Sequence, residues 1–117
     1  MAIVDDDDSV RRALARLLRA EGLRVATFAT ADAYLVATAR GGAPACLVLD
    51  VHLGGASGMS GLELHDHLAG RGAAVPVVLI TADDIPAAEL ARRVGAGRCL
   101  RKPVEGAALL ALVDPGR

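Results

Sequence analysis

Short apolar segments that alternate with segments of helical period constrain the fold of this chain most. Residues 46–49 (CLVL) and 77–80 (VVLI) are uniformly apolar, which is typical of strands covered on both faces in a parallel sheet. Around them, apolar residues recur at the three- or four-residue spacing of a helix face. Strands and helices that alternate in this way predict an α/β protein, with helices on both faces of a parallel sheet.

Five strands and five helices are predicted. The strands are expected at residues 2–4, 24–28, 46–49, 77–80 and 98–101. The helices are expected from Asp7 or Asp8 to Gly22, from Thr30 to Gly41, from Ser60 through Ala69, from Asp84 and Pro86 through Val94, and over residues 104–113. By analogy with one of the two common doubly wound forms, the predicted strand order is 2-1-3-4-5.

Capping residues and apolar faces define the helices further. Asp7 or Asp8 is placed to cap the first helix, and Ser60 with Glu63 forms a capping box for the third. The first helix is expected to bury Val10, Leu14, Leu17 and Leu18 and to turn Arg11, Arg12, Arg16 and Arg19 to the other side. The third helix is expected to carry Leu62, His65, Leu68 and Ala69 on one side.

Charge and composition exclude several classes of protein. Lysine and arginine number 13 against 14 aspartate and glutamate residues, so the net charge is −1 at pH 7. A chain with this balance has no field of one sign to hold nucleic acid or an anionic membrane. No apolar run approaches the ~20 residues of a membrane span, and the acidic start at Asp5 excludes a signal peptide. The expectation is a single cytoplasmic domain over residues 1–117.

Polar side chains follow four of the five predicted strands, at the edge where open α/β sheets bind ligands. Asp5 and Asp6 follow the first strand, Asp50 the third, Thr81 the fourth and Lys102 the fifth. Lys102 is also the only lysine beside twelve arginines. A compact ammonium suits a small anion better than a planar guanidinium does, although chance use of one lysine explains this count equally well.

Three neighbouring carboxylates repel one another unless a divalent cation joins them. A ligand set of oxygen atoms alone favours Mg²⁺. Beside such an ion, one carboxylate is able to attack phosphorus, and Asp50 is the best candidate because it ends the most central strand. A solvated acidic turn with a helix cap accounts for some of residues 5–8, but not for Asp50 or Lys102.

In this order and on these strands, the motifs Val4-Asp5-Asp6, Leu49-Asp50, Ile80-Thr81-Ala82 and Lys102-Pro103 resemble the receiver domain of two-component response regulators. The resemblance covers essentially the whole chain. The stretches VDDDDSVRRAL and CLVLDVHL are most similar to receivers of nitrogen-fixation-type regulators. The resemblance implies a flavodoxin-like fold and a phosphoacceptor that is not itself an enzyme. Its phosphoryl donor would be a sensor histidine kinase or a phosphotransfer protein.

The resemblance also implies roles for single residues. Asp50 would be the phosphoacceptor, and Thr81 and Lys102 would contact the phosphoryl group. The groups that would hold Mg²⁺ are Asp6 directly, Asp5 mostly through water, Asp50, and the main-chain carbonyl of His52. The Lys102–Pro103 peptide is expected to be cis. A partner face for an output domain or a second copy is expected at Arg92, Arg93, Arg98, Arg101 and Val104, with a solvated basic surface as the alternative.

Two departures from the receiver pattern bear on the switch. Cys99 stands where receivers usually carry phenylalanine or tyrosine, and residues 54–58 contain a small insertion that predicts a longer, mobile loop. Cys99 and Cys46 fall on strands separated by the fourth, about 9–10 Å apart, which is too far for a disulfide. His65 and His67 are two positions apart on a helix and are not expected to form a metal pair.

Three other functions stay open from the residues alone. A haloacid-dehalogenase-like phosphatase would need a second aspartate at His52. A flavodoxin-type flavin binder would need a Ser, Thr or Gly-rich loop where residues 5–8 are all aspartate. A receiver-like module that no longer cycles phosphate and serves only in protein interaction is compatible with Cys99 and the lengthened loop.

Overall fold

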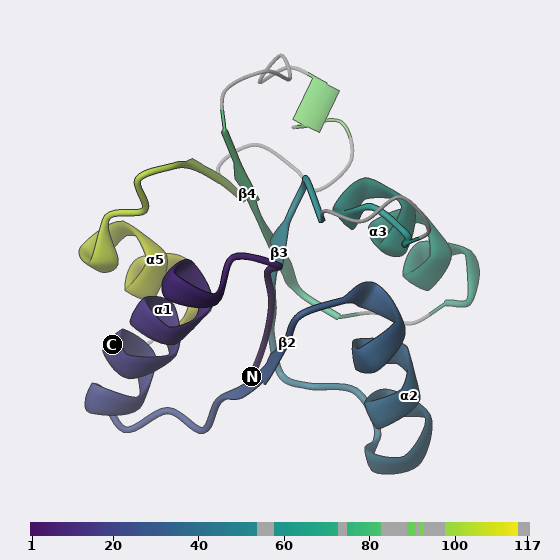
Figure 1. The fold of residues 1–117 in the computed structure, drawn as a ribbon, viewed down its shortest axis with the longest axis horizontal. Coiled ribbons are helices and arrows are strands. Elements are labelled where there is room, and N and C mark those ends of the chain that lie inside the picture. The colour runs from purple at the N-terminus through teal and green to yellow at the C-terminus, as the bar shows by residue number, and fades with distance from the viewer. Residues whose placement is uncertain (54–57, 73–74, 83–88, 91, 93–97, 115–117) are drawn as a thin grey trace.

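Five parallel strands form one sheet in the order β2-β1-β3-β4-β5, as predicted (Figure 1). The structure is a computed structural model that describes residues 1–53, 58–72, 75–82, 89–90, 92 and 98–114. The strands are β1 (Ala2–Val4), β2 (Ala26–Phe28), β3 (Leu47–Asp50), β4 (Val77–Thr81) and β5 (Cys99–Arg101). The predicted α/β, doubly wound fold is therefore confirmed.

Helices cover both faces of this sheet. The helices are α1 (Asp8–Ala20), α2 (Ala31–Gly41), α3 (Gly61–Gly70) and α5 (Gly106–Val113). Figure 1 shows α1 and α5 on one side of the sheet and α2 and α3 on the other. Most of the predicted fourth helix, from Asp84 and Pro86 through Val94, lies outside the described residues, although Glu89 and Leu90 are helical.

Alternate residues of β1, β3 and β4 enter two separate cores. Ile3, Val48 and Ile80 pack with Leu14 and Leu18 of α1. On the other face, Leu49 and Leu79 pack with side chains of α2 and α3. Because β1, β3 and β4 are buried on both faces, their sequences are apolar throughout rather than alternating.

The predicted caps are present. Asp7 caps α1 by accepting a hydrogen bond from the Val10 N–H, and Thr30 caps α2 in the same way. Ser60 and Glu63 form the capping box of α3. In the described part of the chain, no helix is long and apolar enough to cross a membrane.

Several element boundaries differ from the prediction by one or two residues: for example, β3 begins at Leu47 and β5 at Cys99, each one residue later than predicted. β2 begins at Ala26 rather than at residue 24, and α5 begins at Gly106 because Glu105 is its extended N-cap. On α3 the predicted Leu68 is buried and Leu62 and His65 are half-buried, but Ala69 is exposed. Gly61 and Leu64 are also buried.

Candidate functional site

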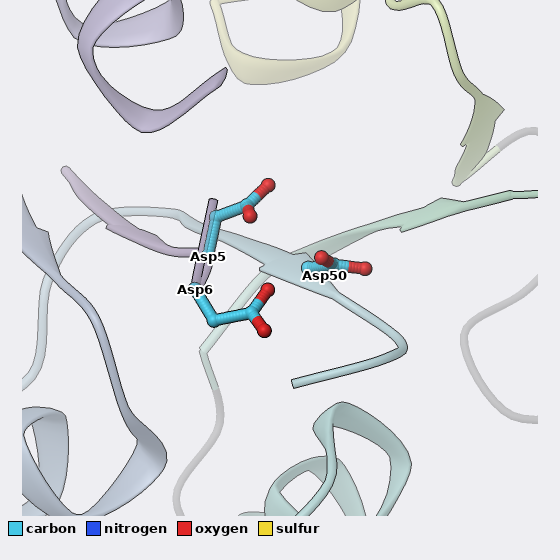
Figure 2. A group of neighbouring side chains, drawn as sticks. All are labelled: Asp5, Asp6 and Asp50. Atoms are coloured by element: carbon cyan, nitrogen blue, oxygen red, sulfur yellow. The ribbon is translucent and has the colours of Figure 1, made fainter. Parts of the chain in front are cut away.

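Three carboxylates meet at the carboxyl edge of the sheet. Figure 2 shows Asp5 and Asp6 next to each other just after β1, with Asp50 at the end of β3. One oxygen from each carboxylate lies within 4.8 Å of the others. β1 and β3 are neighbours with Val4 opposite Leu49, so the parallel register itself brings Asp5 and Asp50 to the same level. The acidic cluster predicted from the sequence is therefore present.

Main-chain amides hold one oxygen of each buried carboxylate. Asp5 and Asp50 are only 1% and 3% exposed, whereas Asp6 is exposed. The Asp7 N–H donates to Asp5 Oδ1 at 2.8 Å, and the His52 N–H donates to Asp50 Oδ1 at 3.0 Å. Each amide lies two residues after its carboxylate, which is the local turn that aspartate favours. The second oxygen of each group is left for other partners.

Lys102 supplies the positive charge at the site. Its Nζ lies 3.1 Å from Asp50 Oδ2 and 3.8 Å from Asp5 Oδ2. Burial lowers the pKa of the Lys102 ammonium, but the hydrogen bond to Asp50 and the charges of Asp5, Asp50 and Asp6 outweigh this effect and raise the pKa overall. The ammonium therefore stays charged between the two buried carboxylates.

One ammonium does not balance the negative charge of three carboxylates, and the pKa of Asp5 is raised. Burial and, to a lesser extent, the charge of Asp50 raise the pKa of Asp5 from 3.8 to about 6, against the opposing effects of the Asp7 N–H and Lys102. Asp5 Oδ2 is a buried oxygen that lacks a hydrogen-bond partner among the described residues. A buried carboxylate oxygen without a hydrogen-bond partner, in a cluster of carboxylates, is a suitable ligand for a hard divalent cation. The cluster could thus bind a metal.

Thr81 and Lys102 reach the site from the next two strands. Thr81 is buried at the end of β4, one residue beyond Ile80, which is paired with Asp50. The Lys102 N–H donates to the Thr81 carbonyl at 2.9 Å. The Lys102–Pro103 peptide is cis, as predicted. The structure therefore brings Asp5, Asp6, Asp50, Thr81 and Lys102 to one edge.

Comparison with known proteins decides among the α/β functions considered above. Residues 1–114 match the family described as the response regulator receiver domain. The chain belongs to this family. Its members are phosphoacceptors of two-component signalling that are generally not enzymes, and they interact with histidine kinases and output domains. The family match argues against the phosphatase and flavin-binding alternatives.

Individual relatives agree with the family match. The chain is 42% identical to transcriptional regulatory protein FixJ of Azorhizobium caulinodans, over 95% of this chain and 51% of that protein. It is 39% identical to response regulator protein TmoT of Ectopseudomonas mendocina, over 95% of this chain and 49% of that protein. The receiver thus spans about half the length of these relatives.

Solved structures of response regulators share this fold. The response regulator StyR matches with a TM-score of 0.83 and 42% identity, over 98% of this chain and 57% of that one. The receiver domain of NtrX from Brucella abortus matches with a TM-score of 0.84 and 27% identity, over 97% of this chain and 94% of that one. The flavodoxin-like receiver fold is therefore shared over nearly the whole chain.

A glycine fixes the start of α3 in this receiver against the acceptor strand. A Cβ atom on Gly61 would lie 2.0 Å from the Asp50 carbonyl oxygen, and the Gly61 N–H donates to the Val51 carbonyl at 3.0 Å. Only glycine fits this approach. From the sequence alone, only the capping box of Ser60 and Glu63 was predicted here, with no role for Gly61. A signal for Gly61 is nevertheless present in the sequence. It directly follows Ser60, which caps the helix that comes after the acceptor strand.

One member of the predicted partner face points elsewhere. Arg98 donates from Nε to the Val77 carbonyl at 3.1 Å and from Nη1 to the Leu112 carbonyl at 3.3 Å. It therefore connects β4 to the end of α5 and is not available for docking, which corrects the prediction. Arg92 and Arg101 are exposed, and Val104 is half-buried. Arg93 lies outside the described residues.

The remaining predictions concern the cysteines, the histidines and the loop. Cys46 and Cys99 are free thiols that belong to cores on opposite faces of the sheet, so the absence of a bond between them is confirmed. His65 is mostly buried and His67 is exposed, which agrees with the expectation that they do not form a pair. Residues 54–57 of the lengthened loop lie outside the described residues.

Proposed function

We propose that this receiver accepts a phosphoryl group on Asp50 in a Mg²⁺-dependent reaction. The donor would be a phosphohistidine on a sensor histidine kinase or a phosphotransfer protein. The observation that carries the proposal is the meeting of three carboxylates with the ammonium of the only lysine, 3.1 Å from Asp50 Oδ2, at the end of the central strand. A cluster of this kind combines a nucleophile, oxygen ligands and a cation for the transferred group.

The transfer forms one bond and breaks another. A carboxylate oxygen of Asp50 attacks phosphorus, the P–N bond of the donor breaks, and its electron pair stays on the histidine nitrogen. The Lys102 ammonium is placed to contact the incoming phosphoryl oxygens because it already lies against Asp50. The Thr81 hydroxyl, at the end of the neighbouring strand, would contact another. We assign no proton transfer to either residue.

Four groups of this chain would hold Mg²⁺. They are the carboxylates of Asp5, Asp6 and Asp50 and the main-chain carbonyl of His52. Bound there, Mg²⁺ would supply the positive charge that offsets the carboxylates and the phosphoryl oxygens. The orphaned Asp5 Oδ2 and the raised pKa of Asp5 support this assignment, because both indicate that the cluster lacks positive charge.

Phosphorylation would then shift the population of the partner-binding face, and later hydrolysis would reset it. We propose that residues 1–117 act as one cytoplasmic receiver unit. By analogy with relatives named as transcriptional regulators, its output would be a transcriptional one, carried by another domain or by a partner. Arg92, Arg93, Arg101 and Val104 remain the proposed partner residues.

The test is the intact mass after incubation with acetyl phosphate, with and without Mg²⁺. We expect the native chain to gain one phosphoryl group only when Mg²⁺ is present, and Asp50→Asn to gain none. Asp32→Asn is the matched control because Asp32 is an exposed aspartate in the first turn of α2, and it should behave like the native chain. No gain in the native chain, with no Mg²⁺ binding, would favour the interaction module that does not cycle phosphate.

A further inference from the structure

Arg11 reaches the main chain of the acidic cluster. It lies in the first turn of α1, and its Nη1 donates to the carbonyl oxygen of Asp5 at 2.7 Å. Its Nη2 contacts the carboxylate of Asp8. The Arg11 side chain is 16% exposed, whereas the side chain of the next residue, Arg12, is 74% exposed. Of these two adjacent arginines, Arg11 is the one that turns back toward Asp5.

The main chain of Asp5 forms hydrogen bonds through both its N–H and its carbonyl group. On one side its N–H donates to the Phe28 carbonyl of β2 at 3.1 Å. On the other side its carbonyl accepts from Arg11, while Asp5 Oδ1 accepts from the Asp7 N–H. These contacts connect β2, the end of β1 and the start of α1 through a single residue. The chain leaves the sheet at this point, where backbone is otherwise least constrained.

Arg11 donates to the main-chain carbonyl of Asp5, whereas Asp5 Oδ1 accepts from the Asp7 N–H and Asp5 Oδ2 has no hydrogen-bond partner among the described residues. An arginine bound to those oxygens would compete with a metal for the same lone pairs. The contact seen here fixes the backbone and leaves Asp5 Oδ2 available. The guanidinium also bridges two acceptors, the Asp5 carbonyl and the Asp8 carboxylate. Its planar, forked donors suit this bridge better than a lysine ammonium would.

We infer that Arg11 is a positioning residue for the metal-binding half of the site. By fixing the Asp5 main chain, it fixes the directions of the Asp5 and Asp6 carboxylates toward Asp50 before any cation binds. This inference rests on the proposed function, because it concerns the same Mg²⁺ site. Outer groups that orient metal ligands typically contribute about 10–100-fold to metal affinity.

The test compares Mg²⁺ affinity in Arg11→Gln, Arg11→Lys and Arg12→Gln with that of the native chain. Arg12 is the matched control because it pairs with the same Asp8 at 3.4 Å while its own side chain stays largely in solvent. Titration followed by the Asp7 amide signal in nuclear magnetic resonance measures binding without phosphorylation. We expect Arg11→Gln to weaken Mg²⁺ binding about tenfold, Arg11→Lys to weaken it less, and Arg12→Gln to leave it within about twofold.

A second readout separates positioning from loss of fold. The rate of phosphorylation by acetyl phosphate is measured against Mg²⁺ concentration for each variant. For a positioning role, Arg11→Gln needs about tenfold more Mg²⁺ but approaches the native rate at saturation. Faster exchange of the Asp7 amide in the metal-free variant, with an unchanged core, is also expected.

The outcomes that overturn the inference are distinct from those that overturn the proposed function. If the native chain binds Mg²⁺ and the folded Arg11 variants bind it equally well, Arg11 has no positioning role and the proposed function stands. If Arg11→Gln and Arg12→Gln weaken binding equally, the effect is one of charge alone, and positioning is also excluded. If the native chain binds no Mg²⁺, both fail together.

Discussion

The two ends of β5 carry cations with opposite roles. Arg98, immediately before the strand, donates to the Val77 and Leu112 carbonyls. Lys102, immediately after the strand, lies against the carboxylates of Asp50 and Asp5. One cation connects neutral main-chain acceptors at the amino edge of the sheet. The other is placed among charged side chains at the carboxyl edge.

The difference follows from the shapes of the two side chains. A guanidinium presents donors in a fixed fork, so it suits two acceptors whose positions do not change. An ammonium is a compact charge on a flexible stem and is able to follow an anion that comes and goes. The single lysine of this chain lies where the acceptor is expected to change its charge, whereas Arg98 lies where nothing is expected to move. The roles of Lys102 and Arg98 can each be tested by substitution.

The largest effect is expected from Lys102→Ala. Removal of one preorganised donor for developing charge typically costs about 10²–10³-fold in rate, which is about 3–4 kcal/mol of transition-state stabilisation. We therefore expect phosphorylation of Asp50 by acetyl phosphate to slow by this factor at saturating Mg²⁺. Lys102→Arg should recover little of the loss, because the planar guanidinium does not replace the point charge. Native rates in Lys102→Ala would show that the charge at this end of β5 is dispensable.

A smaller effect is expected from pH on the metal-free protein. The pKa of Asp5 is about 6 in the folded state and near 3.8 in the unfolded one, so the folded state binds the proton more tightly. The stability that this proton provides is fully present below pH 3.8 and is lost as the pH rises through 6. The difference of about two pKa units corresponds to about 3 kcal/mol in the free energy of unfolding.

Asp5→Asn isolates this contribution from the other carboxylates, which titrate with different signs. We expect the native chain to lose about 2 kcal/mol of this relative to Asp5→Asn between pH 4 and pH 7, measured by urea unfolding without divalent cations. Saturating Mg²⁺ should remove most of that loss at pH 7, because bound metal takes the place of the proton. Parallel pH profiles for the two proteins would refute the raised pKa of Asp5.

The smallest effect is expected at the other end of β5. Arg98→Met removes two hydrogen bonds from a charged donor, so we expect a loss of about 2 kcal/mol in the free energy of unfolding and a melting temperature lower by roughly 8 °C. The extent of phosphorylation should stay as in the native chain. Arg16→Met, on the exposed side of α1, is the control and should change stability by less than about 0.5 kcal/mol. A defect in phosphorylation without loss of stability would reverse the roles assigned to the two cations.

The sequence was sufficient to predict the sheet and the acidic cluster. Buried parallel strands leave continuous apolar runs, and the register of neighbouring strands then places Asp5 near Asp50 without further information. The caps at Asp7, Thr30 and Ser60 followed from the same local patterns. The strand order did not: it was predicted by analogy with a common doubly wound form, and the separation of the two cysteines was predicted from that order.

The long basic side chains could not be placed in this way. Arg11 was expected on the solvent side of α1, and Arg98 on a docking face. Each instead bends back to carbonyl oxygens, of Asp5 for Arg11 and of Val77 and Leu112 for Arg98. Helical or strand period fixes where a Cβ points, but not where a guanidinium several bonds away finds its acceptors. On α3, Ala69 was predicted on the same side as Leu68 but is exposed, whereas the buried Leu64 was not included.

The fit of Gly61 against Asp50 has a mechanical consequence. The space between the first turn of α3 and the Asp50 carbonyl is too small for even a methyl group, and the Gly61 N–H is bonded to the next carbonyl along, that of Val51. Any outward displacement of the acceptor backbone therefore pushes directly on the helix. The coupling acts across a contact and does not depend on the length of chain that joins the two elements. Extra residues in the loop between Asp50 and α3 therefore leave this mechanical coupling in place.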